Sequence, residues 1–395
     1  MAHPEFVEEI RKKLSTNPRI DGWLVHDFCG KNRTILDLFG VPRDVCPSRR
    51  FFYLVPRKGP MVVFVHRVDE HIATYFPGSL ELYSSWEELT GRLLAHLQGK
   101  GTLAMEDWSS ELLPQVCVLD AATKRWLEDN GKAIEPSWPI IEEFVGKMHA
   151  MQKEHLHKAA AILDKAYKLA WKLLKERLVQ KEAISEVELQ AYILRIIRGE
   201  GGTCTGKPIV AAGEHSSIPH HESTKTMIQP NQIVLIDAWC KQDEEISPYA
   251  DFTAVAFTGK ELPVLVSNVF NVAQAAQKQA IAFIETCYKN DLSMTGAEVD
   301  DACRRVITAS SFNGYFTHRT GHNIYLDVHG PGANLDNYET RDTRYLIQGG
   351  CYSIEPGIYL PNEFGIRLEC NIFLEPSKKI TLFNQAPTKL SCIEV

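Results

Sequence analysis

Four acidic residues lie on apolar, strand-forming stretches in the second half of the chain. They are Asp237, Asp251, Glu355 and Glu369. The first two fall within Ile233–Phe257 and the last two within Ser353–Phe373, and each pair is 14 positions apart (251 − 237 and 369 − 355). A polar turn separates the two apolar runs of each stretch, which predicts two β-hairpins. A carboxylate on an apolar strand is costly to bury unless it is paired or binds a cation, although an exposed strand face would also accommodate it.

Two histidines lie between the predicted hairpins. The segment is TGHNIYLDVHG, which contains His322 and His329. Carboxylates together with one or two imidazoles form the ligand set that suits a pair of hard or borderline divalent ions, such as manganese, cobalt or zinc. The residue types therefore favour a metal site over simple ion pairing.

The order Asp, Asp, His, Glu, Glu, with the motifs GH, DVHG and IEPG around the later members, resembles the pita-bread metallopeptidases. This group includes aminopeptidase P, prolidase and methionine aminopeptidase. The similarity extends over about residues 151–395 and is weak over residues 1–150. The resemblance implies that five residues hold two divalent ions: Asp237, Asp251, His322, Glu355 and Glu369. It further implies that Asp237 chelates one ion, that His322 and Glu355 bind the other, and that Asp251 and Glu369 bridge the two.

The resemblance also implies three catalytic residues, which are His220, His329 and Glu355. Glu355 would take and return a proton during turnover. His329, in DVHG, corresponds to the family histidine near the substrate carbonyl. His220 lies 17 residues before Asp237 and corresponds to the histidine that stabilises the tetrahedral intermediate (237 − 220). Its neighbour His221 remains the competing choice.

Two further residues resemble substrate-binding residues of the family, His318 near a proline pocket and Arg367 beside the bridging glutamate. Tyr325 or Tyr359 could line the wall of that pocket. A structural role is the alternative for both. A histidine on a loop needs no role in binding, and Arg367 could instead hold Glu369 in its bridging orientation.

Several positions depart from the family pattern without removing a ligand. The aspartate hairpin is about three residues longer than usual, and Trp239 stands where a small residue is common. Arg319 and Asn323 replace glycines around His322, and Cys370 replaces an acid. Trp239 and Arg319 could narrow the cleft or change its charge, and so alter the choice of substrate.

Composition limits the class of protein. The 395 residues suggest two domains, and the 44% hydrophobic content suits a globular protein with a full core. A formal net charge of −7 without a basic run makes nucleic acid and anionic membrane poor partners. We expect no transmembrane helix and no signal peptide. The ten cysteines form no CxxC pair, which indicates free thiols and a cytoplasmic location.

The pattern of apolar residues predicts an α+β protein with two domains. Residues 1–140 are expected to form a smaller α/β domain like the N-terminal domain of aminopeptidase P and prolidase, and residues 141–395 the pita-bread domain. Strands are expected at 22–25, 51–55, 61–65 and 102–105, and helices at 86–97 and 121–130. The first domain is expected to shape the substrate cleft and the subunit contact, or to be purely structural.

The second domain is expected to repeat one plan twice around a curved antiparallel sheet. Each repeat consists of a long helix, a capped helix and an acidic hairpin. The long helices are expected to begin near Ile141 and at Val269, and capping boxes at Ser185–Glu188 and Thr295–Glu298 to open the shorter ones. An internal duplication would bring the two acidic hairpins together across a pseudo-twofold axis.

The resemblance implies dinuclear-metal hydrolysis of peptide bonds, with manganese the first choice of metal. The activity would be release of the N-terminal residue from Xaa-Pro peptides or cleavage of Xaa-Pro dipeptides by a homodimer. The partners would be small peptides with proline in second position, and neither nucleic acid nor a membrane. A creatinase-like C–N hydrolase and a non-catalytic binding module are the alternatives. Retention of all five ligands argues against both.

Overall fold

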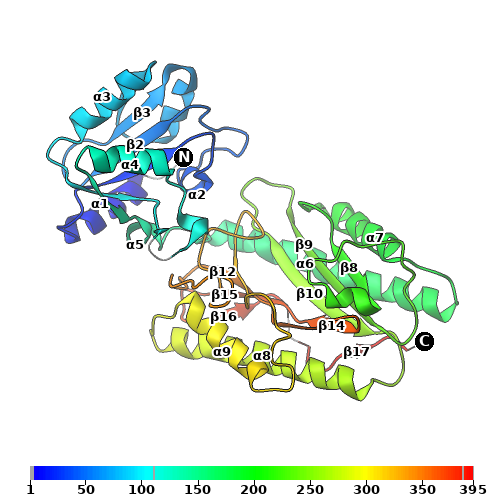
Figure 1. The fold of residues 1–395 in the computed structure, drawn as a ribbon. Coiled ribbons are helices and arrows are strands. Elements are labelled where there is room, and N and C mark those ends of the chain that lie inside the picture. The colour runs from blue at the N-terminus through cyan, green and yellow to red at the C-terminus, as the bar shows by residue number, and fades with distance from the viewer. Residues whose placement is uncertain (1–3, 110–111, 385–386, 395) are drawn as a thin grey trace. The chain divides into compact units, whose positions relative to one another are not determined.

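The computed structural model describes residues 4–109, 112–384 and 387–394 of the chain (Figure 1). Contacts divide the chain into two compact units, Met1–Val145 and Gly146–Val395. The division falls a few residues after the domain boundary expected at 140.

The first unit is built on a six-stranded mixed sheet with the strand order β4-β3-β2-β1-β5-β6. The strands are β1 (Gly22–Asp27), β2 (Phe51–Pro56), β3 (Val62–His66), β4 (Ser79–Tyr83), β5 (Thr102–Met105) and β6 (Ala133–Pro136). The helices are α1 (Pro4–Thr16), α2 (Arg33–Leu38), α3 (Trp86–His96), α4 (Ala121–Asp129) and α5 (Trp138–Ile141), with 3₁₀ turns η1 (Arg67–Tyr75) and η3 (Pro114–Val116). Every residue of β1 and β2 is buried, because layers of helix cover both faces of these central strands.

The second unit contains four long or medium helices and three groups of strands. The helices are α6 (Ala150–Val179), α7 (Glu186–Gly199), α8 (Val264–Lys289) and α9 (Gly296–Thr308), with the 3₁₀ turn η4 (Gly213–Ser217). The strands are β7 (Gly202–Thr203), β8 (Ile209–Ala212), β9 (Ile233–Gln242), β10 (Ala250–Phe257), β11 (Asn323–Ile324), β12 (Cys351–Ile354), β13 (Gly357–Leu360), β14 (Phe364–Arg367), β15 (Cys370–Leu374), β16 (Ile380–Leu382) and β17 (Ser391–Cys392). All described pairings in this unit are antiparallel except that of β10 with β17.

The first long helix begins at Ala150 and not near Ile141 as the apolar pattern suggested. The short helix α5 ends at Ile141, and Gly146 then adopts a left-handed backbone conformation with φ of +73°. A Cβ atom at Gly146 would lie 2.5 Å from Oδ1 of Asn323, so only glycine fits this close approach. His149 and Gln152 then form the capping box that starts α6.

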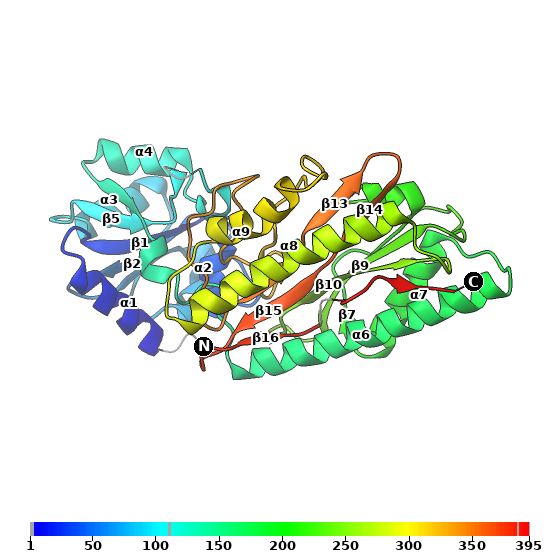
Figure 2. The same ribbon diagram turned by 90° about the horizontal axis from the view of Figure 1, so that it is seen from below.

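The repeated plan of helix, capped helix and hairpin is present twice in the second unit (Figure 2). α6, α7 and the pair β9–β10 form the first copy, and α8, α9 and the pair β12–β15 form the second. Ser185 with Glu188 and Thr295 with Glu298 make the two expected capping boxes. The fold is therefore the α+β pita-bread arrangement that the sequence predicts.

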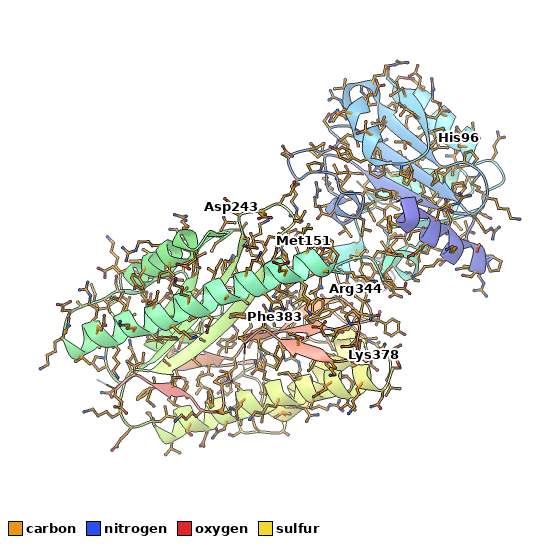
Figure 3. All side chains as sticks on the ribbon, turned by 180° about the vertical axis from the view of Figure 1, so that it is seen from behind. His96, Met151, Asp243, Arg344, Lys378 and Phe383 are labelled. Carbon is orange, nitrogen blue, oxygen red and sulfur yellow. The ribbon has the colours of Figure 1, made fainter. Side chains whose placement is uncertain are left out.

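The helix α6 covers the strands over much of its length (Figure 3). Its buried residues pack with alternate residues of β9, namely Val234, Ile236, Ala238 and Cys240. Because side chains alternate across a strand, the residues between them point away from α6. Asp237 and Trp239 belong to that second set. Among the described residues, no helix combines the length and the apolar character needed to cross a lipid bilayer.

Candidate metal centre

The two aspartates of the first hairpin lie diagonally across the pair β9–β10. Asp237 is paired with Thr253, and Asp251 is paired with Trp239. Residues in register, or two positions away from it, project from the same face of a sheet. Both carboxylates and the Trp239 side chain therefore share the face that α6 leaves open.

The second hairpin is interrupted at both of its glutamates. β12 pairs with β15 and β13 pairs with β14, while Glu355 and Glu369 fall between these two ladders. The carbonyl groups before them, on Ile354 and Leu368, accept hydrogen bonds at 3.0 and 2.9 Å from the side-chain amide of Gln277, a fully buried residue of α8. The amide of α8 thus replaces ladder bonds that the interruption removes, and it fixes the backbone in front of each glutamate.

Side-chain bonds join the two hairpins. The amide of Asn371 donates to the Asp251 carbonyl at 2.7 Å and accepts from the Asp251 N–H at 2.9 Å, as a paired strand would. The hydroxyl of Thr253 donates to Oε2 of Glu369 at 2.7 Å. Acids that are 118 positions apart in the chain, Asp251 and Glu369 (369 − 251), are in this way held next to each other.

His322 turns one ring nitrogen toward these acids. Its Nδ1 lies 3.1 Å from the carbonyl oxygen of Asn323, which can only accept, so Nδ1 carries the proton. Nε2 lies 3.3 Å from Glu355 and 3.8 Å from Asp251. Potential ligand atoms of Asp251, His322 and Glu369 all lie within 4.8 Å of one another. A backbone acceptor on the far nitrogen is the usual way in which proteins orient a metal-binding histidine.

The donor set fits a divalent cation on two further observations. Oδ1 of Asp251 and Oε1 of Glu369 are buried and lack a hydrogen-bond partner among the described residues. Burial and the neighbouring carboxylates raise the pKa of both acids well above the usual range. Burial also raises the pKa of Asp237, in opposition to the charge of Arg367. Buried acids crowded in this way become stable as carboxylates when a cation offsets their charge.

Arg367 contacts one of the acids directly and a second through a threonine. Its guanidinium donates to Asp237 at 2.5 Å, to Thr253 at 3.1 Å and to the hydroxyl of Tyr359 at 2.9 Å. Tyr359 also lies 2.8 Å from Nε2 of His318. The two residues expected to bind substrate are thus joined through one tyrosine. Burial lowers the pKa of His318 to about 4, which favours its neutral form.

All nine site residues inferred from the sequence line one cavity of about 830 Å³ in the second unit. They are Asp237, Asp251, His322, Glu355, Glu369, His220, His329, His318 and Arg367. The ring of His329 lies 4.4 Å from that of His322, and the proximity of that imidazole together with burial lowers the pKa of His329 to about 3. Tyr325 and Tyr359 do not line this cavity, although the hydroxyl of Tyr359 contacts His318 and Arg367, which do. Trp239, Arg319 and Glu339 line the cavity instead.

His220 and His221 point to different surroundings. His221 is 8% exposed and its Nε2 lies 2.9 Å from Glu186, whereas His220 is exposed and lines the cavity. Glu186 and His215, which form a second cluster with His221, were not predicted from the sequence. The charged residue Glu186 at the first position of a capped helix was the available signal, but such residues usually only complement the helix dipole.

The sequence also matches known proteins. The pattern of "Metallopeptidase family M24" covers residues 154–376, more than half of the chain. A putative Xaa-Pro aminopeptidase of Mycoplasma genitalium is 28% identical over 52% of this chain, and the chain spans only 55% of that relative's length. An Xaa-Pro dipeptidase of Lactobacillus delbrueckii subsp. lactis is 27% identical over 71% of this chain and 76% of its own length.

Solved structures agree with the fold. A dipeptidase from Mycobacterium ulcerans matches 100% of this chain and 98% of its own with a TM-score of 0.75 at 20% identity. A recombinant prolidase from Thermococcus sibiricus matches 99% of both chains with a TM-score of 0.68 at 23% identity. The acids follow the order expected for this family and line one cavity. The family pattern itself matches residues 154–376. The chain belongs to metallopeptidase family M24, the pita-bread metallopeptidases.

Proposed function

We propose that the protein is a dinuclear-metal exopeptidase that hydrolyses the bond before a proline in second position. The observation that carries this proposal is the group of buried acids around His322, with an unpartnered oxygen on Asp251 and another on Glu369 among the described residues. Such a group has little purpose in a binding module. A creatinase-like enzyme would not require these five ligands.

Charge supports two ions over one. Asp237, Asp251, Glu355 and Glu369 carry four negative charges, and Arg367 offsets one of them through its contact with Asp237 (4 − 1 = 3). A single divalent ion would leave a net charge of −1 (−3 + 2), and a second would give +1 (−3 + 4), a positive site that a hydroxide nucleophile would neutralise. Asp251 and Glu369, which are held next to each other where the two hairpins are joined, would be the acids shared by both ions. Manganese fits a mainly oxygen ligand set with one imidazole, and cobalt or zinc are the alternatives.

The ligand set determines the chemistry. When bound, a metal pair supplies a water of lowered pKa and a positive field for the oxyanion that develops on the scissile carbonyl. Glu355, beside His322 in the cavity, takes the proton of the attacking water and returns it to the leaving nitrogen. His220 and His329 are exposed to the cavity and donate to the substrate carbonyl or the intermediate. His221 is already engaged by Glu186, which favours His220 for this role.

The preference for proline rests on the named relatives and on the chemistry of the bond. A bond to proline has no N–H and its ring fixes φ near −65°, so peptidases that orient that N–H fail on it. Both relatives have names that refer to Xaa-Pro substrates. The neutral His318, held by Tyr359, lines the cavity and is our candidate for the group beside the ring, and Arg367, which contacts the same tyrosine, would support it. We also infer a homodimer that acts on small peptides in the cytoplasm, with residues 1–140 as its creatinase-like N-terminal domain.

The test is a panel of Ala-Pro, Ala-Pro-Ala and Ala-Ala-Ala with enzyme loaded with manganese, cobalt or zinc. Cleavage of either proline peptide at a rate far above that of Ala-Ala-Ala supports the proposal. The ratio between the two proline peptides separates a dipeptidase from an aminopeptidase. Equal rates on Ala-Pro-Ala and Ala-Ala-Ala would leave a general aminopeptidase and contradict the proline preference.

A further inference from the structure

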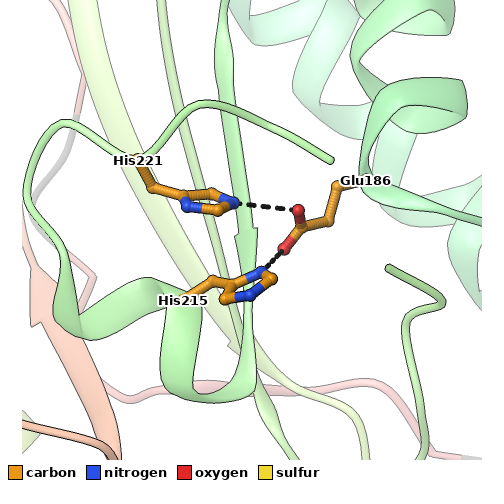
Figure 4. A group of neighbouring side chains, drawn as sticks. All are labelled: Glu186, His215 and His221. Carbon is orange, nitrogen blue, oxygen red and sulfur yellow. Dashed lines mark hydrogen bonds and ion pairs between the residues drawn. The ribbon is translucent and has the colours of Figure 1, made fainter. Parts of the chain in front are cut away.

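Glu186, His215 and His221 form a compact cluster outside the proposed ligand set (Figure 4). Glu186 is the first residue of α7 and is fully buried. Nδ1 of His215 donates to its Oε1 at 2.8 Å, and Nε2 of His221 donates to its Oε2 at 2.9 Å. The two rings stack with centroids 4.3 Å apart and an interplanar angle of 28°.

The carboxylate of Glu186 has enough donors without a metal ion. Besides the two histidines, it accepts from the N–H of Ala212 at 2.9 Å, from the N–H of Thr224 at 2.8 Å and from the Thr224 hydroxyl at 3.0 Å. Burial would raise its pKa, but the donors of His221, Thr224, Ala212 and His215 hold that pKa below its usual value. A carboxylate that accepts several hydrogen bonds is stable when buried and charged. The cluster is therefore a hydrogen-bond junction that does not call for a cation.

This junction holds the segment that carries His220. Ala212 and Thr224 are the two ends of the segment, and both donate their backbone N–H groups to Glu186. His215 and His221 lie inside the segment and donate to the same carboxylate. One buried side chain therefore fixes a loop of 13 residues (224 − 212 + 1) at four positions.

The other side of the same segment is held by β14. The N–H of Gly365 donates to Oγ of Ser216 at 2.9 Å, and a Cβ atom at Gly365 would lie 2.1 Å from the Ser216 carbonyl oxygen. Arg367 donates to the carbonyl of Pro219 at 3.3 Å. His220 thus lies between Pro219, which Arg367 holds, and His221, which Glu186 holds.

We propose that Glu186 is a positioning residue, which acts through His221 and the backbone to place His220 against the substrate at the metal centre. This inference rests on the proposed function, in which His220 donates to the substrate. Glu186 itself does not contact the substrate. Its effect on turnover must therefore depend on the presence of the His220 imidazole.

A double-mutant cycle tests this dependence. Glu186→Gln replaces one acceptor oxygen by an NH₂ group, which cannot accept from Ala212 or Thr224. We expect a kcat about tenfold below that of the native enzyme, because coupled neighbours typically interact by this amount. KM should stay within about twofold, as for a loss confined to the transition state. In the His220→Ala background the same change should cost nothing further.

The matched control is Glu188→Gln, two positions along the same helix. Glutamine keeps the capping box with Ser185, so kcat and melting temperature should stay near native values. If Glu186→Gln fails to fold, His221→Phe removes one arm of the junction and keeps a ring that can stack on His215. It should show the same loss of kcat and the same dependence on His220.

Three outcomes would overturn the inference. A full tenfold loss that persists in the His220→Ala background would show a general structural effect. An unchanged kcat for Glu186→Gln would show no role. Loss of one bound metal equivalent in Glu186→Gln, with the other ligands intact, would instead identify the cluster as a metal site.

A crystal structure of Glu186→Gln separates this inference from the proposed function. If the native enzyme cleaves no Xaa-Pro peptide, the proposed function fails, yet the structure still reports on the junction. We expect His220 displaced from its native position while Asp251 and Glu369 stay in place. An unmoved 212–224 segment would overturn the positioning role whatever the substrate.

Discussion

The guanidinium of Arg367 acts on two of the proposed metal ligands at once. It donates directly to Asp237 at 2.5 Å, and it donates to the hydroxyl of Thr253 at 3.1 Å, which in turn donates to Glu369 at 2.7 Å. Asp237 and Glu369 come from different hairpins. One side chain can therefore set the orientation of two proposed metal ligands, which favours a supporting role for Arg367 over direct reading of the substrate.

We expect Arg367→Lys to lower turnover about 10- to 100-fold, the usual cost of losing a residue that orients metal ligands. Lysine keeps the charge but cannot contact Asp237, Thr253 and Tyr359 together. The loss should be the same on Ala-Pro and Ala-Pro-Ala and should be accompanied by weaker metal retention. A loss that depends on the residue after proline, with metal retained, would assign Arg367 to the substrate.

The amide of Gln277 offers a test of the break in the glutamate hairpin. Gln277→Leu leaves the carbonyls of Ile354 and Leu368 buried without their donor, at about 1–3 kcal/mol for each group. We expect a lower free energy of unfolding in urea and weaker metal binding. Gln279→Leu, on the exposed side of the same helix, is the matched control and should change neither quantity. Native metal affinity in Gln277→Leu would mean that the backbone before the glutamates needs no such support.

The histidines at the cavity should affect turnover more than metal content. His329→Ala and His220→Ala should each lower kcat about 10²- to 10³-fold, as the loss of one oxyanion donor does. Elemental analysis of both variants should give the native metal content. Activity of His220→Ala within a fewfold of the native enzyme would move the role to another residue.

A buried histidine in the first unit predicts how stability depends on pH. Burial lowers the pKa of His26 to about 4, and its two ring nitrogens lack hydrogen-bond partners among the described residues. Between pH 6.5 and 4 the unfolded chain binds a proton that the native state does not, so stability falls as pH falls through this window. The lowered pKa of His26 corresponds to a free energy of unfolding that is about 2 kcal/mol smaller at pH 5 than at pH 7.

The control for this prediction is a histidine of the same unit that lies in water. His26→Leu should reduce the difference between the unfolding free energies at pH 7 and pH 5, whereas His71→Leu, at an exposed position, should leave it unchanged. An unaltered difference in His26→Leu would show that other groups determine the acid sensitivity.

Local signals were sufficient for much of the fold. The capping boxes of Ser185 and Thr295 involve residues three apart, so sequence alone predicts them. The start of α6 was missed because it depends on Gly146 approaching Asn323, a residue far away in the chain. Apolar periodicity cannot reveal such a contact.

In the candidate site, too, sequence alone indicated some residues, while others depend on contacts between distant parts of the chain. The acids and His322 could be inferred because their types, order and motifs carry chemistry. The interruption of the second hairpin at Glu355 and Glu369 was not predicted, although Pro356 and Gly357, which follow Glu355, are a local signal for a break in a strand. Nor could spacing reveal Gln277 or Glu186, whose partners lie in other elements. Residues that position the site are polar groups on ordinary helices, and only the folded chain shows which groups they hold.

The most direct test of the account is the number of divalent ions that the purified, metal-supplied protein binds, measured by elemental analysis. We predict about two equivalents, as expected for a two-metal site. Asp251→Asn should retain fewer, and Glu339→Gln, a change to another cavity-lining acid, should retain both. A native protein that binds no divalent ion, or an Asp251→Asn variant that keeps both ions, would contradict the assignment of the metal centre.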